Sequence, residues 1–218
     1  MAKIRVVSAF VPIEGHPRSM EEYSALGLRL REINAPLKVF YHPLQDCWLY
    51  KTLVRLPGEF TCSKGDNPAK NTLGYHIVQH NKPEWLGAAS FKDKDADVFV
   101  WIDYGIFSIP GVTADVINSF LEKVKEDDFA IPGCWPADRP IMDDTPHWRF
   151  CGGLLVVPRQ YLRRFSREFQ DRTMRNVNLK RNVTWEVNDL ARLEKYGTLP
   201  IRWYQADHNE TMFTGYSK

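Results

Sequence analysis

Short apolar runs alternate with longer amphipathic stretches along this chain of 218 residues. The most apolar run, residues 98–102, has five consecutive hydrophobic residues and leads directly into Asp103. A continuous run of this kind is typical of a strand buried on both faces, as in a parallel sheet. Five further runs also predict strands, at residues 4–11, 36–41, 129–133, 150–157 and 201–204.

The stretches between these runs have apolar residues at helical spacing. Ser19 and Glu22 form a capping box, which predicts a helix that runs from Ser19 to about Ile33. Thr113 is expected to cap a helix whose apolar face includes Phe120. The other predicted helices span residues 47–56, 67–91 (with Pro83 as the favoured point of a break), 159–175 and 185–196.

Strands that alternate with helices predict an α/β protein with a mainly parallel central sheet flanked by helices. The chain has no internal repeat, low-complexity tract or linker, and its length suits one domain with a substantial core. We therefore expect residues 1–218 to form a single domain. Residues 12–18 and 135–147 are rich in Pro, Gly or Asp and predict loops.

The charge and hydropathy of the chain exclude several classes of partner. The net charge is +2, which favours neither nucleic acid nor a membrane surface. No apolar run approaches the length of a membrane span, and the first residues do not resemble a signal peptide. We expect no nucleic-acid partner, no membrane span and a cytoplasmic location.

The four cysteines are spread along the chain as Cys47, Cys62, Cys134 and Cys151. None of them forms a Cys-x-x-Cys pair, so the spacing indicates neither a zinc site nor a disulfide framework. Reduced thiols fit the expected cytoplasmic compartment.

Familiar nucleotide-binding and hydrolase motifs are absent. The chain has no Gly-x-Gly-x-x-Gly after the first strand, no P-loop and no Gly-x-Ser-x-Gly elbow. Candidate chemistry therefore has to be sought at the ends of the predicted elements.

Asp103 is the first candidate, because open α/β sheets bind ligands at the carboxyl ends of their strands. An ionised acid beside a core needs a partner, which here would be a metal ion, a cation or backbone N–H groups. The alternative is that Asp103 caps a turn, in which Gly105 supplies a positive φ.

Three further segments carry candidate groups. Gly152 and Gly153 interrupt an apolar run, where glycine allows a ligand to approach the backbone, or else marks a bulge. Glu186 and Asp189 lie near a predicted helix start, where acids also favour the helix dipole. His208 follows the last predicted strand and is either a ligand or an ordinary surface residue.

In their order along the chain, these segments resemble the nucleotide-sugar-dependent glycosyltransferases of GT-A type, and in particular the small HtrL/YibB-like glycosyltransferases. The likeness runs from about residue 4 to residue 213. It consists of a first strand ending at residues 8–11, a helical region at residues 70–83, the strand end at Asp103, Gly152-Gly153, Glu186 and His208.

The resemblance implies a Rossmann-like GT-A sandwich that transfers a sugar from a UDP- or GDP-linked donor to a hydroxyl of a glycan or glycoconjugate. It also implies a divalent cation, Mn²⁺ or Mg²⁺, held by Asp103 and His208. Gly105 stands where the usual Asp-x-Asp motif has its second acid, which weakens that expectation. The implied donor-binding residues are Ala9, Phe10, Val11, Asn71, Lys82, Asp103, Gly152 and Gly153.

An inverting reaction would also need a general base, for which Glu186 is the first choice and Asp189 the second. A retaining reaction would need neither acid as a base. The loop at residues 135–147 is expected to be mobile without ligand and to form the acceptor side of the cleft, since Trp135 and Trp148 flank it.

Two alternatives remain open. The missing second acid at Gly105 favours a domain of the same fold that binds carbohydrate or a partner without catalysis. The second alternative is a nucleotidyltransferase, a class expected to have a glycine-rich loop with Arg or Lys after the first strand. Here that loop has only one glycine and Arg18, which is a poor match.

Overall fold

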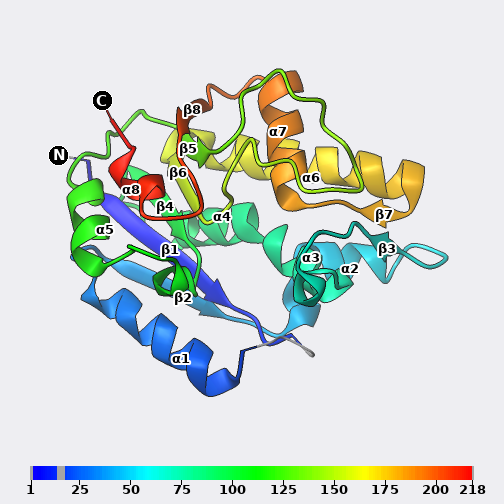
Figure 1. Ribbon diagram of the computed structural model, residues 1–218, viewed down its shortest axis with the longest axis horizontal. Coiled ribbons are helices and arrows are strands. Elements are labelled where there is room, and N and C mark those ends of the chain that lie inside the picture. The colour runs from blue at the N-terminus through cyan, green and yellow to red at the C-terminus, as the bar shows by residue number, and fades with distance from the viewer. Residues whose placement is uncertain (1, 14–17, 218) are drawn as a thin grey trace.

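The computed structural model describes residues 2–13 and 18–217 and has a mixed α/β architecture (Figure 1). Six strands form one sheet in the order β2-β1-β4-β6-β5-β8. All neighbouring pairs are parallel except those of β6, which runs antiparallel to β4 and β5. The predicted mainly parallel sheet is therefore confirmed. Its strands are β1 (Ile4–Phe10), β2 (Leu37–Tyr41), β4 (Val98–Ile102), β5 (Ala130–Gly133), β6 (Leu154–Pro158) and β8 (Arg202–Gln205).

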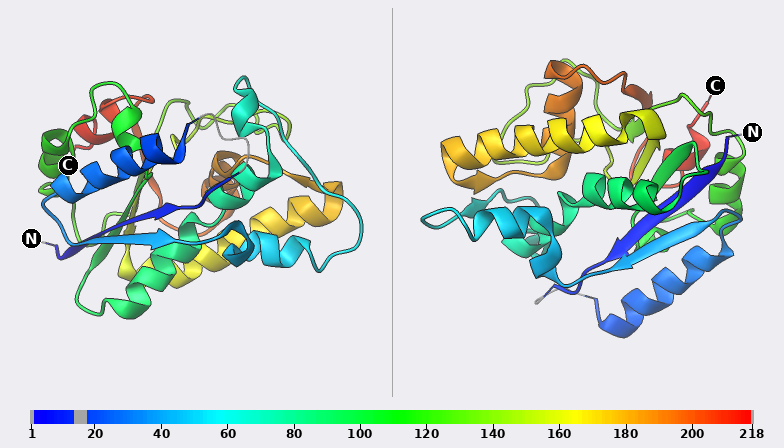
Figure 2. Two further views of the ribbon diagram at one scale, coloured as in Figure 1. Left: turned by 90° about the horizontal axis from the view of Figure 1, so that it is seen from below. Right: turned by 180° about the vertical axis from the view of Figure 1, so that it is seen from behind.

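Helices cover both faces of this sheet (Figure 2). One core layer includes residues of α1, α5 and α8, and the other includes residues of α4, α6 and α7. Val6 and Val7 of β1 are both fully buried and pack into opposite layers, as the alternation of side chains along a strand requires. The helices are α1 (Met20–Leu28), α2 (Trp48–Leu53), α3 (Leu73–Gln79), α4 (Lys82–Lys92), α5 (Ala114–Leu121), α6 (Arg159–Lys180), α7 (Glu186–Tyr196) and α8 (Thr211–Thr214).

β4 lies inside the sheet, between β1 and β6, and all five of its residues are buried. This explains why its sequence is apolar without alternation. Ile102 is paired with Leu154 of β6, so the chain leaves β4 beside the residues that precede β6. The backbone N–H of Asp103 donates to the carbonyl of Gly153 at 3.0 Å, which extends this pairing by one residue.

Two helix starts are confirmed in detail. The Ser19 hydroxyl accepts from the N–H of Glu22 at 3.2 Å, and the Glu22 carboxylate accepts from the N–H of Ser19 at 2.7 Å. Thr113 caps α5 by accepting from the N–H of Val116 at 3.3 Å.

Several boundaries differ from the predictions. The helical pattern of residues 67–91 is broken at His80 and Asn81, because Pro83 lies in the first turn of α4, where a missing N–H costs no hydrogen bond. α6 continues to Lys180, and Arg181 then ends it in the left-handed conformation. The predicted strand at residues 150–157 begins only at Leu154, so both glycines precede it.

A second sheet of two strands was not predicted. β3 (Thr61–Cys62) and β7 (Asn182–Val183) form a parallel pair that joins the segment before α3 to the segment before α7. Each strand has only two residues, too few to produce a recognisable alternation. Within the described ranges, no helix combines the length and the apolar character needed to cross a membrane.

Candidate active site

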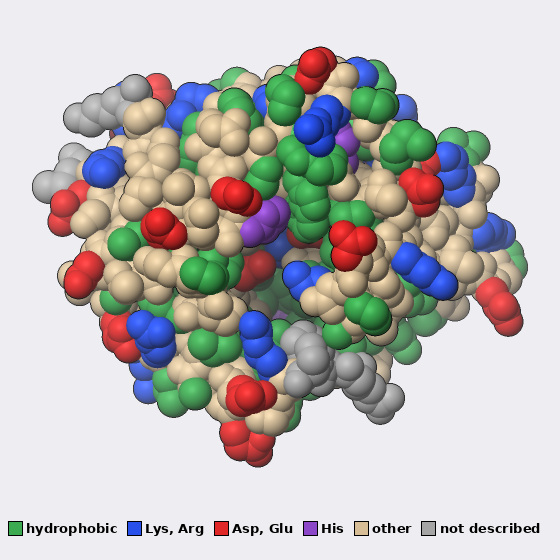
Figure 3. Space-filling model, in the orientation of Figure 1, with side chains coloured by type: hydrophobic (Ala, Val, Ile, Leu, Met, Phe, Trp, Pro, Cys, Tyr) green, Lys and Arg blue, Asp and Glu red, His purple; other side chains and the backbone are tan. Residues whose placement is uncertain are grey.

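The candidate site lies at the edge of the sheet where β1, β4, β5 and β8 end. Because β6 is antiparallel to β4 and β5, its amino end lies at the same edge. The face of the molecule seen in Figure 3 is hollowed near its centre, and acidic, basic and histidine side chains gather around the hollow.

A cavity of ≈ 260 Å³, lined in part by Ile4, Ala35 and Leu121, lies instead at the amino end of β1. Ligands of α/β sheets bind at the carboxyl edge, so we place the site there.

A buried lysine joins two carboxylates at this edge. The Nζ of Lys82 donates to the carbonyl of Gly152 at 2.9 Å and to Oε1 of Glu186 at 3.0 Å, and it lies 3.3 Å from Oδ1 of Asp103. The side chains of Lys82 and Glu186 are 3% and 7% exposed, whereas that of Asp103 is 35% exposed. Asp103 is therefore the member of this cluster that a substrate can reach.

The positions of the three residues follow from their elements. Lys82 and Glu186 are the first residues of α4 and α7, and Asp103 directly follows β4. A cation at a helix N-terminus is disfavoured by the helix dipole and a carboxylate is favoured, so Lys82 depends on its two acidic partners. We call Lys82, Asp103 and Glu186 the ion cluster.

Burial and charge act in opposite directions on the ion cluster. Burial lowers the pKa of Lys82, but the carboxylates of Asp103 and Glu186 together raise it above its ordinary value. Burial likewise raises the pKa of Glu186, but the Lys82 ammonium and other nearby groups bring it below its ordinary value. Lys82 and Glu186 are therefore both charged at neutral pH.

Two neighbours hold the ion cluster in place. The Trp101 indole N–H donates to Oδ1 of Asp103 at 2.6 Å, and its ring stacks on Trp85 of α4 at a centroid distance of 5.5 Å. Gly152 has a φ of +71°, and a Cβ on it would lie 2.7 Å from Oε1 of Glu186. Gly152 is thus required both by its backbone conformation and by the closeness of Glu186. A Cβ on Gly153 would be 3.8 Å from Oδ2 of Asp103, an ordinary contact.

The end of β1 lies beside β4, but its side chains take different directions. Ala9 and Val11 are buried in the core layer of α4 and α6. The ring of Phe10 packs against Tyr23 and Tyr104 at centroid distances of 5.5 and 5.0 Å. Backbone groups and the Phe10 ring are thus what this strand end can offer to a ligand.

Arg18 is a candidate that the sequence analysis did not select. A Cβ on Gly105 would lie 3.4 Å from a terminal nitrogen of Arg18 and 3.5 Å from the Tyr23 ring. A guanidinium group therefore lies next to the position of the second acid of an Asp-x-Asp motif. Nothing in the spacing of Arg18 along the sequence indicates this closeness.

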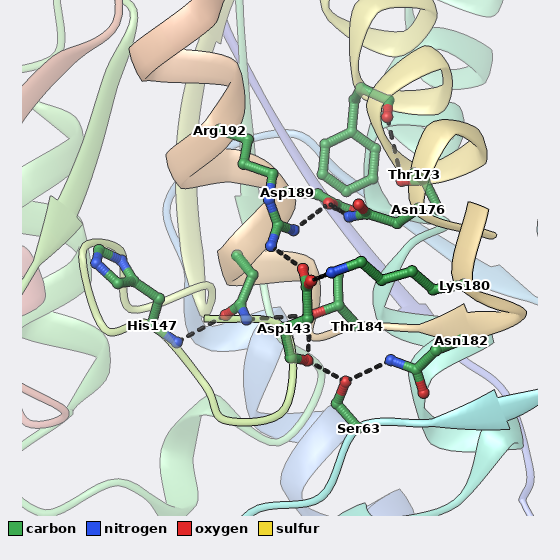
Figure 4. A network of polar contacts seen from close by, with 12 residues as sticks. Ser63, Asp143, His147, Thr173, Asn176, Lys180, Asn182, Thr184, Asp189 and Arg192 are labelled. Atoms are coloured by element: carbon green, nitrogen blue, oxygen red, sulfur yellow. Dashed lines mark hydrogen bonds and ion pairs between the residues drawn. The ribbon is translucent and has the colours of Figure 1, made fainter. Parts of the chain in front are cut away.

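The structure does not bring Asp189 to the site. Its side chain is fully buried and contacts Nε2 of His80 at 3.2 Å, Nδ2 of Asn176 at 3.0 Å and Arg192 at 2.9 Å. Figure 4 shows Asp189 beside Asn176 of α6 and Arg192 of α7. A carboxylate enclosed in this way fastens two helices together and cannot meet an acceptor hydroxyl.

Asn71 also has a structural place. Its side-chain oxygen accepts from the N–H of Gly65 at 2.7 Å, and its side-chain nitrogen donates to the carbonyl of Gly65 at 2.9 Å. A Cβ on Gly65 would lie 2.8 Å from the Trp185 ring, which places this loop against the residue before Glu186. Asn71 thus shapes a wall near the ion cluster.

The loop at residues 135–147 is anchored in its second half. Asn188 of α7 accepts from the N–H of His147 at 2.6 Å and donates to the carbonyls of Met142 and Thr145 at 2.7 and 2.8 Å. Asp143 forms ion pairs with Lys180 and Arg192 (Figure 4). Trp135 is anchored as well, because its N–H donates to the carbonyl of Trp148 at 2.9 Å and its carbonyl accepts from Arg149 at 3.0 Å. The predicted mobility of this loop remains a prediction, and it concerns residues 136–141 more than the anchored parts.

His208 does not share a ligand set with Asp103. Its Nδ1 lies 3.6 Å from Sγ of Cys134, which in turn lies 3.7 Å from Sγ of Cys151. The hydrogen bond to Cys134 raises the pKa of His208. The contact with Cys151, together with His208, lowers the pKa of Cys134 to about 6. The spacing of the cysteines gave no sign of this cluster, because its members follow or precede three different strands.

The residues around Asp103 do not fit an Mg²⁺ or Mn²⁺ site. These ions prefer several oxygen ligands, and Asp103 is a single carboxylate whose Oδ1 already contacts an ammonium and an indole N–H. The charge of Lys82, 3.3 Å from Oδ1, would repel a divalent cation. The expected metal site on Asp103 and His208 is therefore not supported by the geometry of either residue.

The fold of this chain has a counterpart among solved structures. The structure is similar to the crystal structure of a glycosyltransferase involved in the glycosylation of the major capsid of PBCV-1, with a TM-score of 0.54 and 12% sequence identity. The similarity covers 94% of this chain and 81% of that one. At this identity, the likeness concerns the fold.

A second solved structure, the apo form of mouse xyloside xylosyltransferase 1, has a TM-score of 0.41 and 9% identity over 93% of this chain and 84% of that one. The fold assignment depends on the first structure alone. No protein-family model and no curated protein sequence matches the chain.

Proposed function

We propose that this protein transfers a sugar from a nucleoside-diphosphate-sugar donor to a hydroxyl group of an acceptor. The observation that carries the proposal is the ion cluster of Lys82, Asp103 and Glu186 at the ligand-binding edge of a glycosyltransferase fold. Burying the charged side chains of Lys82 and Glu186 is costly, and buried groups with perturbed pKa values are concentrated at functional sites. The HtrL/YibB-like resemblance and a UDP- or GDP-linked donor are part of this proposal.

The donor is proposed to lie across the ends of β1 and β4. Backbone groups of residues 9–11 and the Phe10 ring would contact the nucleotide, and Gly153 leaves room beside the sugar. The position of Arg18 next to Gly105 suits the negative charge of the diphosphate. In this arrangement a guanidinium supplies the charge that a metal supplies in enzymes with an Asp-x-Asp motif.

During transfer, the acceptor oxygen forms a bond to the anomeric carbon, and the bond from that carbon to the diphosphate oxygen breaks. In an inverting reaction a carboxylate accepts the hydroxyl proton. The sequence-based hypothesis gave this role to Glu186, but Asp103 is the more exposed acid. We propose Asp103 as the acid that contacts substrate and Glu186 as a residue that positions it through Lys82.

The acceptor is proposed to be a glycan or glycoconjugate that approaches from the side of Trp148. The Trp148 ring lies 6.3 Å from the Trp185 ring and 4.5 Å from that of His208, measured between centroids. Aromatic rings offer flat apolar faces with a polar tip, which suits sugar rings. All four cysteines are free, which is compatible with the expected reducing, cytoplasmic location.

Thermal unfolding in the presence of UDP and GDP tests the donor site. One of the two nucleotides at 100 times its Kd should stabilise the protein by about 2.7 kcal/mol. The stabilisation should not require added Mn²⁺ or Mg²⁺. If it appears only with one of these cations, the argument against a cation at Asp103 is wrong. If neither nucleotide stabilises the protein but a sugar does, the non-catalytic binding domain is the better hypothesis.

Two isosteric substitutions separate the proposed roles of the acids. Asp103→Asn should lower turnover of the identified donor by ~10²-fold or more while nucleotide affinity stays nearly constant, because the carboxylate acts in the transition state. Glu186→Gln should shift the pH dependence of kcat, because it changes the charge beside Lys82. Turnover of Asp103→Asn within about threefold of the parent protein would exclude the role assigned to Asp103.

A further inference from the structure

Two cysteines and a histidine meet at the same edge of the sheet, where β6, β5 and β8 are neighbours. Cys134 directly follows β5, Cys151 lies three residues before β6, and His208 lies three residues after β8. β5 and β8 are parallel and β6 is antiparallel to β5, so these three positions face one another. The proposed transfer reaction uses none of the three side chains.

The distances within this cluster match those of a tetrahedral metal site. The two sulfur atoms are 3.7 Å apart, and Sγ of Cys134 is 3.6 Å from Nδ1 of His208. All three ligand atoms lie within 4.8 Å of one another. Zinc bonds of about 2.3 Å to sulfur and about 2.0–2.1 Å to nitrogen, at tetrahedral angles, place two sulfurs about 3.8 Å apart and a sulfur and a nitrogen about 3.5–3.6 Å apart.

The surroundings also suit a bound ion. Cys151 is buried, Cys134 is half-buried and the side chain of His208 is 41% exposed, so the cluster is closed on one side and open on the other. The ring of Trp148 packs edge-on against His208 at 4.5 Å, and Asp207 accepts from the backbone N–H of His208 at 2.7 Å. These contacts restrict the position of His208 next to the two cysteines. Among the described residues, no other group of His, Cys, Asp or Glu side chains is close enough together to share an ion in this way.

We propose that Cys134, Cys151 and His208 bind one thiophilic divalent cation, with Zn²⁺ as the ion that best matches two thiolates and an imidazole. The fourth coordination position is available to water or to Asp207, whose Oδ1 lies 3.7 Å from both Sγ of Cys134 and Nδ1 of His208. Such an ion joins the start of the 135–147 loop, the residues before Gly152 and the segment after β8. This site is separate from Asp103 and does not depend on the proposed transfer reaction.

Substitution of Co²⁺ for zinc tests the proposal directly. Metal-free protein, kept reduced, should bind one Co²⁺ per chain and develop a thiolate-to-cobalt charge-transfer band together with the visible bands of tetrahedral cobalt, and Zn²⁺ should remove both. Competition against a chromophoric chelator then gives the zinc affinity. The variants Cys134→Ser and His208→Gln should each weaken it by at least about tenfold. His208→Gln changes an exposed side chain and should fold normally even if Cys134→Ser does not.

Two matched controls locate the site. Cys62→Ser removes a cysteine that lies away from the cluster, and Asp103→Asn removes the acid that was expected to share a metal with His208. Both should bind zinc with the affinity of the parent protein. The proposal is overturned if the protein binds no Co²⁺ with thiolate bands, or if His208→Gln leaves the zinc affinity unchanged. It is also overturned if Cys62→Ser weakens binding as much as Cys134→Ser does.

Discussion

Lys82 is the residue on which the candidate site depends most. Its three closest polar partners are a carbonyl oxygen and two carboxylate oxygens, all within 3.3 Å of Nζ. A buried ammonium would be unfavourable at the start of α4 without them. Its partners come from the residues around β4, β6 and α7, so one side chain sets the spacing of three elements.

Removing the charge of Lys82 should be strongly destabilising. Lys82→Met leaves the buried Glu186 without its cation, which costs about 3–5 kcal/mol. The double variant Lys82→Met with Glu186→Gln removes both partners of that pair and should recover part of this loss. Urea unfolding of both single variants and the double variant gives the coupling energy.

We expect that coupling energy to be at least about 1 kcal/mol in favour of the native pair. Strict additivity of the two single effects would show that Lys82 and Glu186 do not depend on each other, and the ion cluster would lose its assigned role.

At the scale of the elements, the two glycines before β6 have different tasks. Gly152 has a positive φ and lies against Glu186, whereas Gly153 has space for a Cβ that would point toward Asp103. Gly152 is therefore needed for folding of this segment. Gly153 is needed only if a ligand approaches the backbone there.

The pair Gly152→Ala and Gly153→Ala tests this division of roles. Gly152→Ala should lower the free energy of unfolding by about 1–3 kcal/mol, because it combines an unfavourable φ with displacement of Glu186. Gly153→Ala should change stability by less than about 0.5 kcal/mol but should weaken binding of the donor nucleotide. Equal losses of stability in the two variants, measured by urea unfolding, would contradict the assignment.

The elements also show what could be predicted from the sequence. The strand that ends at Asp103 and the helix that starts after Ser19 have strong local signals, an uninterrupted apolar run and a capping box. β3 and β7 have two residues each and exist only because they pair with each other.

The candidate site could also be predicted only in part, because some of its residues have a local signal in the sequence and others do not. Residues at strand ends could be selected from the sequence, as Asp103, Gly152 and Gly153 were. Contacts between distant segments could not be predicted, because no local sequence pattern encodes them. The approach of Arg18 to Gly105 and the meeting of Cys134 with Cys151 are of this kind. Asp189 was selected as an acid near the start of a predicted helix, but its side chain is held by His80, by Asn176 of α6 and by Arg192.

For the whole molecule, one buried histidine affects stability at acid pH. Burial lowers the pKa of His76 from 6.5 to about 4, and Nδ1 of this side chain donates to the carbonyl of Thr184 at 3.0 Å. The unfolded chain takes up a proton on this residue below about pH 6.5, and the folded protein does so only near pH 4. The folded state therefore loses stability as the pH falls from about 6.5 to about 4.

His76→Asn should flatten this part of the stability profile. Between pH 7.5 and pH 5 the parent protein should lose on the order of 2 kcal/mol through His76, at about 1.4 kcal/mol per pH unit below 6.5. The variant should be less stable at pH 7.5, because a ring is lost from the core, but should lose correspondingly less on acidification. Urea unfolding at the two pH values gives both differences. If the variant loses as much stability between pH 7.5 and pH 5 as the parent protein does, His76 is not the responsible group.

The sheet order has a consequence for the protein while it is being synthesised. β1, β2 and β4 are complete once residue 102 has been made, but the outer edge of β4 pairs only with β6, whose last residue is Pro158. At ~5–20 residues per second, the ribosome needs roughly 3 to 11 seconds to supply that partner. During this time the edge of Val98–Ile102, the most apolar strand of the sheet, is available for pairing with other chains. A nascent chain that pauses between β4 and β6 would therefore be a natural client for chaperones that shield unpaired strands.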